Sequence, residues 1–239
     1  MFETNPRCEV SVLGYKEGPA LNALFAGILD LVQLNSSYYI ISEHGKPCLR
    51  QMKKSTSAGQ DEWIVSTYAG NCKEKNKDID GLRLDARFQT ALDPKIHAKF
   101  LFFIDRILQQ IKRIDMSSNY LMTVHKSDIV PRRLVLGKNI NEFYVAVGYG
   151  ILHIKDGEES WLAGGETAGD VIGQLNQAKF NLLIDLERLR DKTLLVAESG
   201  NGSMKVIDLE ARNVYKICEG KLVGFLLLEK FIALVVIAI

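Results

Sequence analysis

The sequence contains few of the residues that break or cross-link a chain: five prolines and four cysteines among 239 residues. With so little proline, 47% hydrophobic residues and 25% charged residues, the composition excludes a collagen-like or disordered protein. The formal net charge is only +1, so no overall positive field attracts nucleic acid. We therefore expect a folded, soluble protein and regard a dedicated nucleic-acid binder as disfavoured.

The four cysteines, Cys8, Cys48, Cys72 and Cys218, are too few and too widely spaced for a disulfide framework or a CxxC zinc site. Free cysteine behaves as a small core hydrophobe, so we expect buried free thiols. The first residues also lack the apolar segment of a secretory signal. This favours a cytoplasmic protein, although a fragment of a longer secreted chain has the same features.

A segment of the form Gly-x4-Ala-x-Phe occurs three times, at residues 18–25, 81–88 and 173–180. Each copy follows a run that ends in a hydrophobic-x-Gly turn, where glycine allows positive φ as the chain leaves one sheet for the next. Alanine permits close approach of the backbone, and phenylalanine fills a large volume. We therefore expect the segment to lie in the connections and its phenylalanine, Phe25, Phe88 or Phe180, to fill the wedge between adjacent sheets.

Four short strand-like runs, separated by turn residues, recur in each of four units. The expected strands are 28–34, 38–42, 48–53 and 63–68, then 90–96, 99–104, 108–114 and 120–124, then 133–137, 142–147, 151–155 and 160–164, and finally 182–186, 193–197, 204–207 and 214–218. Four-stranded units repeated every ~40 to 60 residues are typical of propeller blades. The sequence thus predicts an all-β protein, a β-propeller of four-stranded antiparallel blades with four complete blades.

The two ends of the chain bear on how such a ring closes. Residues 8–13 resemble the outer strand of a blade, and residues 222–239 resemble two further strands around a turn at Glu229 and Lys230. Together they are expected to form a fifth blade that removes free edges, and a truncated six-bladed ring is the alternative. The apolar stretch 222–239 also permits a C-terminal membrane anchor, which the two central charges disfavour. We expect a single domain over residues 1–239, monomeric and not membrane-bound.

The fourth unit resembles an NHL repeat. The family pattern runs Leu-Ala-Gly, Ala-Arg-Phe, Leu-Tyr-Val-Ala-Asp and Asn-x-x-Ile-Arg. The chain matches it with Trp161-Leu-Ala-Gly-Gly, Gln177-Ala-Lys-Phe180, Leu194-Leu-Val-Ala-Glu-Ser-Gly-Asn201 and Met204-Lys-Val-Ile-Asp208. The match is closest here, moderate in the two earlier units with the phenylalanine, and weakest around Phe143. The resemblance implies a propeller, and the family contains both binding modules and metal-dependent enzymes.

An acidic residue closes the second strand in three of the four units: Glu43, Asp105 and Glu198, with Gly148 at the equivalent place in the third unit. A carboxylate at a strand end can accept hydrogen bonds from backbone N–H groups of the following turn. Alternatively, three carboxylates that converge on a central channel can hold a cation. The sequence leaves both interpretations open.

The sequence contains no Walker A loop, no Gly-x-Ser-x-Gly elbow, no His-Glu-x-x-His and no Rossmann glycine motif. The histidines His44, His97, His125 and His153 lie at different places in their units, so we do not expect them to converge on a metal. We accordingly expect no catalytic residues and no cofactor. The sequence predicts a non-catalytic binding module or scaffold, whose protein partner contacts loops after the second strands. The candidate residues are His44, Arg106, Tyr149 and Asn201.

Two other functions follow from the resemblance. One is a metal-dependent propeller enzyme of the amidating-lyase or lactonase type, with its metal in the axial channel. The other is RNA binding through a basic face, for which the pairs at 112–113 and 132–133 are the candidates. Few aromatic residues interleave these basic residues, so we rank RNA binding last.

Overall fold

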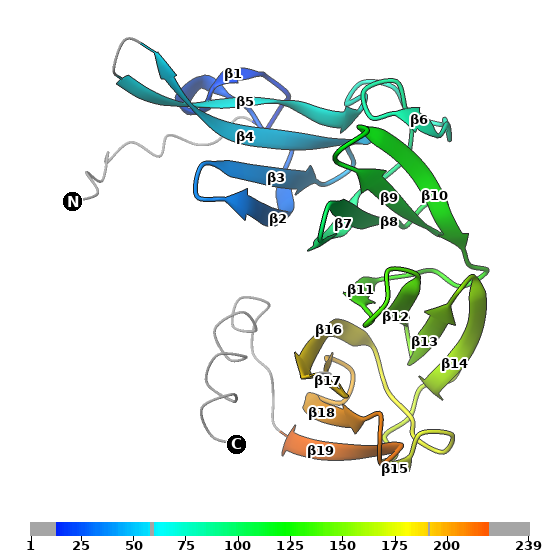
Figure 1. Ribbon diagram of the computed structural model, residues 1–239. Coiled ribbons are helices and arrows are strands. Elements are labelled where there is room, and N and C mark those ends of the chain that lie inside the picture. Colours follow the sequence, from blue (N-terminus) through cyan, green and yellow to red (C-terminus); the bar gives the residue numbers. More distant parts are fainter. Residues whose placement is uncertain (1–12, 58–59, 191, 220–239) are drawn as a thin grey trace. The chain divides into compact units, whose positions relative to one another are not determined.

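The structure, a computed structural model, describes residues 13–57, 60–190 and 192–219 (Figure 1). Apart from one 3-10 turn, η1 (Ala20–Asn22), the regular elements described are all β-strands. No helix in these ranges is long and apolar enough to cross a membrane. Residues 8–12 and 222–239 lie outside the described residues, and with them the predicted fifth blade and the membrane-anchor alternative.

The described chain forms two compact units that divide after Thr123. The first unit holds two antiparallel sheets, with strand orders β1-β5-β4-β3-β2 and β6-β10-β9-β8-β7. Their bounds are β1 (Gly18–Pro19), β2 (Ile28–Asn35), β3 (Tyr38–Glu43), β4 (Cys48–Ser57), β5 (Gln60–Gly70), β6 (Gly81–Leu82), β7 (Leu92–His97), β8 (Phe100–Asp105), β9 (Gln110–Asp115) and β10 (Tyr120–Lys126), the last of which runs across the division.

The second unit also holds two antiparallel sheets, with orders β11-β12-β13-β14 and β15-β19-β18-β17-β16. Their bounds are β11 (Arg133–Leu136), β12 (Glu142–Ala146), β13 (Gly150–Lys155), β14 (Glu158–Gly164), β15 (Gly173–Gln174), β16 (Leu183–Arg190), β17 (Thr193–Glu198), β18 (Ser203–Asp208) and β19 (Asn213–Glu219). Each sheet contains one predicted run of four consecutive strands. The prediction of an all-β, propeller-like fold with four such units is confirmed.

The repeated segment contributes a strand that the sequence did not reveal. Its first two residues form β1, β6 and β15, each of which adds to the last strand of the following sheet, so that Gly18 pairs with Val65 and Gly173 with Val214. These two glycines have φ values of 115° and 111°, which side chains with a Cβ rarely adopt. Two residues are too few to show the periodicity of a strand, so the glycine was the only sign of these strands in the sequence.

The phenylalanines of the second and third copies pack as expected. Phe88 and Phe180 are fully buried, and Phe88 lies in a core formed by both sheets of its unit, with its ring centroid 4.9 Å from that of Phe103. Phe180 occupies the same place in the second unit. Phe25 differs, because it is only half-buried and lies against the Arg50 guanidinium, 4.7 Å from its ring centroid. The expectation that all three would be equivalent therefore fails for the first copy.

The hairpin of β4 and β5 is longer than predicted. The predicted strands, 48–53 and 63–68, left the polar residues between them outside the ladder. Instead Lys54 pairs with Trp63 and Thr56 with Asp61. The Thr56 hydroxyl donates to Asp61 at 2.7 Å, and the Lys54 ammonium lies 2.5 Å from the same carboxylate. Cross-strand polar pairs thus extend the ladder beyond the apolar part of the sheet.

The expectation of free cysteines is wrong for two of the four. Cys48 and Cys72 form a disulfide across a sequence separation of 24 residues, whereas Cys218 is free and exposed. Cys48 pairs with Gly70 at the end of the β4–β5 ladder, and this pairing brings the segment after β5 beside the start of β4. The proximity arises from strand register, which the cysteine spacing alone does not show.

Candidate binding surface

The acidic residues at the ends of the second strands are buried and hold the incoming connections. Each accepts a hydrogen bond from the backbone N–H of the residue after the repeated phenylalanine. The N–O distances are 2.6 Å for Ala26 to Glu43, 2.6 Å for Gln89 to Asp105 and 2.8 Å for Asn181 to Glu198. The expectation that these carboxylates accept hydrogen bonds is confirmed. The expected donors, backbone N–H groups of the following turn, supply only one bond among the described residues, from Leu108 to Asp105 at 3.3 Å.

A basic residue follows each of these acids at a spacing of seven residues, on the third strand of the sheet. These residues, Arg50, Lys112 and Lys205, have no exposed surface. Arg50 lies 3.3 Å from Glu43, and Lys205 lies 2.8 Å from Glu198. The carboxylates are therefore engaged within their own sheets, which favours the structural interpretation over a channel cation.

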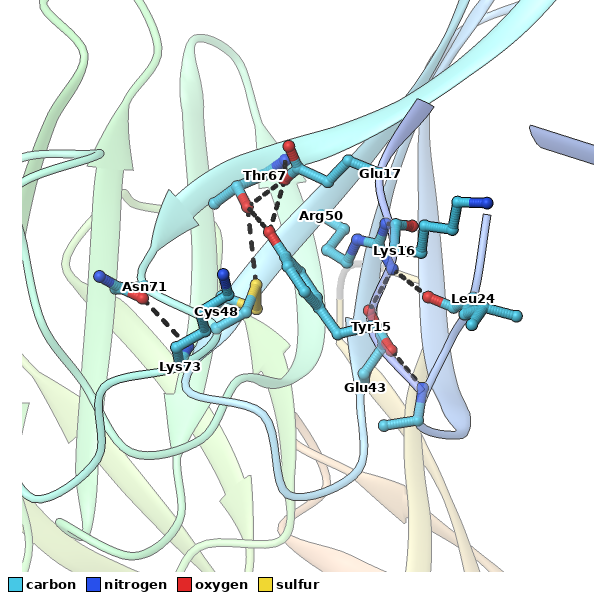
Figure 2. The surroundings of a disulfide bond; sticks show 12 residues. Tyr15, Lys16, Glu17, Leu24, Glu43, Cys48, Arg50, Thr67, Asn71 and Lys73 are labelled. Atoms are coloured by element: carbon cyan, nitrogen blue, oxygen red, sulfur yellow. Dashed lines mark hydrogen bonds and ion pairs between the residues drawn. A yellow bond between two sulfur atoms is a disulfide. The ribbon is translucent and has the colours of Figure 1, made fainter. Parts of the chain in front are cut away.

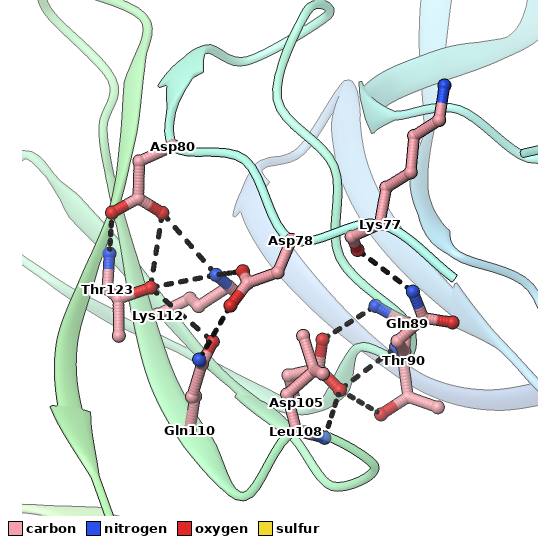
Figure 3. A network of polar contacts seen from close by, with 10 residues as sticks. All are labelled: Lys77, Asp78, Asp80, Gln89, Thr90, Asp105, Leu108, Gln110, Lys112 and Thr123. Atoms are coloured by element: carbon pink, nitrogen blue, oxygen red, sulfur yellow. Dashed lines mark hydrogen bonds and ion pairs between the residues drawn. The ribbon is translucent and has the colours of Figure 1, made fainter. Parts of the chain in front are cut away.

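Lys112 has a wider set of partners (Figure 3). Its ammonium lies 2.7 Å from Asp78 and 2.8 Å from the Thr123 hydroxyl, with Asp80 at 3.4 Å. Asp105 lies nearby, and its burial raises the pKa of its carboxyl against the opposing hydrogen bonds from Gln89, Leu108 and Thr90 and the charge of Lys112. Lys112 thus belongs to the interior, and the basic pair at 112–113 does not offer RNA two exposed cations.

The third unit lacks this pair. Strand pairing aligns Ala146 and Ile151 with Ala197 and Met204, so the position of Glu198 is taken by Val147 and not by Gly148. The position of Lys205 is taken by Leu152. Val147 and Leu152 are both buried, each 1% exposed. An apolar pair thus replaces the buried acid and the buried base of the other three sheets.

The four predicted contact residues lie in two places. His44 and Arg106 are exposed and belong to the first unit, whereas Tyr149 and Asn201 are half-buried and belong to the second. The Asn201 side-chain amide already donates to Glu198 at 2.5 Å and to the Gly169 carbonyl at 2.9 Å. This amide therefore fixes its own loop. Partner binding by these residues stays a prediction.

Lys46, in the loop that carries His44, lies over the ring of Tyr15, and this ring lines an open hollow on the first unit. The hollow has a volume of 460 Å³, and its lining includes Tyr15, Thr67, Asn71 and Lys73. The disulfide joins Cys72, in the lining of the hollow, to Cys48 at the start of β4 (Figure 2). The backbone N–H of Asn71 donates to the Pro47 carbonyl at 3.2 Å. The rim is therefore held by one covalent and one hydrogen-bonded link.

A compact group of polar side chains closes one side of the hollow. The Glu17 carboxylate accepts hydrogen bonds from the Tyr15 hydroxyl at 2.7 Å, from the Thr67 backbone at 2.7 Å and from the Thr67 hydroxyl at 2.6 Å (Figure 2). Burial opposes ionisation of Glu17, but the hydrogen bonds from Thr67 and Tyr15 outweigh it and lower its pKa. Burial raises the pKa of Tyr15. At neutral pH the carboxylate is charged and Tyr15 is a neutral donor.

The histidines have separate surroundings. The Nε2 atom of His125 lies 2.8 Å from Glu159, and that of His153 lies 3.0 Å from Glu142. The ring of His153 also stacks on Tyr144, with centroids 4.9 Å apart. Among the residues that the structure describes, no group of three or more histidine, cysteine, aspartate or glutamate side chains is placed to hold a metal ion.

The sequence analysis proposed His44 as a contact residue but not Tyr15, Lys46 or Lys73, which lie near its loop. One signal was present: Lys46 and Lys73 each lie within two residues of a cysteine of the disulfide. Without the pairing of those cysteines, the two lysines are unrelated in sequence. Tyr15 is brought to Thr67 across 52 residues, which no local pattern indicates.

No protein-family model matches the sequence, and no curated protein matches it. Several solved structures are similar in fold. A putative phosphatase from Bacteroides thetaiotaomicron has a TM-score of 0.54 at 10% identity, over 80% of this chain and 49% of its own. A streptogramin B lyase has a TM-score of 0.53 at 11% identity, over 84% of this chain and 57% of its own. An auxiliary nutrient binding protein from Bacteroides ovatus has a TM-score of 0.50 at 12% identity, over 90% of this chain and 62% of its own.

Identities this low show the fold alone. They agree with the antiparallel four-strand units in indicating a propeller-type architecture. The chain spans between about half and three fifths of the length of these three structures. Their different descriptions, a phosphatase, a lyase and a nutrient binding protein, show that one fold serves several functions.

Proposed function

We propose that the chain is a non-catalytic binding module that recognises a protein partner through loops that follow the second strands of its sheets. The observation that carries this proposal is the contrast between the interior and the loops. The buried acids and bases are engaged in holding the sheets and connections together, whereas His44 and Arg106 are exposed on loops of a rigid scaffold. Surfaces of this kind are where binding residues concentrate.

Membership of the NHL-repeat family is part of the same proposal. The fourth unit, where the resemblance is closest, places three of its matching residues in one hydrogen-bonded group. Asn201 and Lys205 both contact Glu198, and the Lys205 ammonium also donates to the carbonyl of Lys179, next to Phe180. The resemblance thus involves residues that share one structural role.

The alternative of a metal-dependent enzyme is ranked second. Two of the four histidines are bonded to single carboxylates in separate places, and no described cluster suits a metal. Elemental analysis of untagged protein tests this ranking. One zinc or calcium bound tightly per chain, and lost on substitution of His125 and His153, would make the enzyme the better proposal.

We also retain a single, monomeric domain over residues 1–239 as a proposal, and light scattering coupled to size-exclusion chromatography tests it. The disulfide favours an oxidising compartment over the predicted cytoplasmic one, because cytosolic thiols are kept reduced. We therefore propose the secreted alternative. A non-reducing digest of protein taken from its natural source tests this, since a linked Cys48–Cys72 peptide pair is expected.

Site-specific photo-cross-linking tests the binding surface. A photoreactive residue is placed at His44, at Arg106 or, as a control, at Ser118, which is exposed in the turn between β9 and β10. We expect a cross-linked protein of one defined mass from the His44 and Arg106 variants and none from Ser118. Equal cross-linking from all three positions, or none from any, would contradict the proposal.

A further inference from the structure

The ring of Tyr15 lies beneath several cations. The ammonium groups of Lys46 and Lys73 are each 5.8 Å from the ring centroid, and the Arg50 guanidinium is 4.9 Å from it. Arg50 is fully buried and paired with Glu43. Lys73 is exposed and Lys46 half-buried, and in the described part of the chain neither lysine forms an ion pair.

Two like charges beside one ring create a positive potential that an anion relieves. The ring face attracts each ammonium, but the two ammonium groups repel each other, and solvent in the open hollow screens them only in part. Glu17 places one negative charge at the hydroxyl end of the ring, where it accepts hydrogen bonds from Tyr15 and Thr67, and the two ammonium charges exceed it by one. The ring face therefore retains an excess of positive charge.

The hollow also has the size and rigidity of a ligand site. Its volume of 460 Å³ falls in the range of roughly 300–1,000 Å³ that is typical of small-molecule pockets. The disulfide and the hydrogen bond from Asn71 to Pro47 hold the loops of Lys46 and Lys73 together. Little ordering of these loops is then needed on binding, which favours affinity.

We propose that the hollow binds a small ligand through an oxyanion, a carboxylate or phosphate group, held between Lys46 and Lys73 above the ring of Tyr15. The remaining volume accommodates an attached apolar or aromatic group, next to the exposed side chain of Leu84. This site goes beyond the proposed protein-binding function. Failure of the cross-linking experiment leaves it intact, because the site requires no protein partner.

Calorimetric titration of the full chain with phenyl phosphate, benzoate and neutral benzyl alcohol, at low ionic strength, tests the proposal. We expect one site per chain for at least one of the two anions and none for benzyl alcohol. Binding of benzoate alone or of phenyl phosphate alone identifies the preferred oxyanion. Added salt weakens the interaction, because surface charges are screened.

The decisive variant is Lys46→Met with Lys73→Met, compared with Lys75→Met plus Lys155→Met. The control removes the same net charge from two exposed lysines. We expect at least a tenfold loss of affinity in the first variant and less than a twofold change in the control. Lys73→Met alone serves if the double variant does not fold. Equal losses in both double variants, full retention in the first, or no binding of either anion would overturn the proposal.

Discussion

Replacing Lys205 tests whether the buried acid and base act as one structural unit. The Lys205 ammonium lies 2.8 Å from Glu198, and neither side chain has exposed surface. The third sheet provides a natural template for its removal, because Val147 and Leu152 stand at the equivalent positions. The substitutions Lys205→Leu and Glu198→Val, alone and together, therefore introduce the apolar pair of the third sheet, while the Asn181 N–H, which has no counterpart there, stays in place.

The expected magnitudes follow from what each variant leaves behind. Lys205→Leu leaves the Glu198 carboxylate buried without a cation, which costs about 3–5 kcal/mol. Glu198→Val leaves the Asn181 N–H without its acceptor. The Lys205 ammonium keeps two partners, Asp170 and the Lys179 carbonyl, both at 2.9 Å. We expect this variant to cost about 3 kcal/mol. The double variant has no unpaired charge at this place. We expect it to cost about 2–4 kcal/mol, well below the sum of the single effects.

Urea unfolding followed by circular dichroism measures the three free energies, with Lys155→Leu, an exposed site in the third sheet, as the control. The control is expected to change stability by less than about 0.5 kcal/mol. The reasoning is refuted if the double variant equals the sum of the single variants within about 0.5 kcal/mol. It is equally refuted if Lys205→Leu costs less than about 1 kcal/mol.

Three further predictions concern packing, covalent structure and pH. Phe88→Ala is expected to lower the free energy of unfolding, measured in urea, by about 3–5 kcal/mol. Phe25→Ala is expected to lower it clearly less, because of these two side chains only Phe88 is fully buried. Equal losses would contradict the proposal that the buried phenylalanine fills the wedge between sheets. Replacing Cys48 and Cys72 by serine is expected to cost about 3 kcal/mol, measured by unfolding under non-reducing conditions, and no change would exclude the disulfide. Hydrogen bonds from Lys205 and Lys216 lower the pKa of Asp170 below its usual 3.8. The ionised Asp170 therefore stabilises the folded protein above that pH, and this contribution is lost as the pH falls. In urea unfolding at a series of pH values, Asp170→Asn is expected to lose less stability than the natural protein between about pH 5 and 2, and an unchanged profile would contradict this.

The strands were predictable because their signal is local. A strand such as β12 or β17 is a run of apolar residues bounded by turn residues, and these patterns located sixteen of the strands in four units. The two-residue strands β1, β6 and β15 were not predictable, because they exist only through pairing with a distant partner. The polar tip of the β4–β5 hairpin was missed for a related reason: composition does not distinguish a polar ribbon from a loop.

The sequence could predict only those parts of the candidate site that directly follow a predicted strand. The loop of His44 follows a recognisable strand, so its exposure was expected. The association of Tyr15, Lys46 and Lys73 depends on a disulfide and on a contact across 52 residues, which a single sequence does not encode in any local pattern. The cysteine interpretation failed in the same way, since it used spacing where strand register decided the pairing.

The buried acid, the buried base and the repeated segment occur together, and this association explains where the repeat resemblance is strong and where it is weak. In three sheets, the segment that precedes the sheet presents a backbone N–H beyond its phenylalanine, and a buried donor requires an acceptor. The acid supplies the acceptor, and the base compensates the buried charge of the acid. The third sheet follows β10 by a short connection, residues 127–132, without the segment. No N–H of that kind enters this sheet, so neither acid nor base is required, and Val147 and Leu152 fill the space.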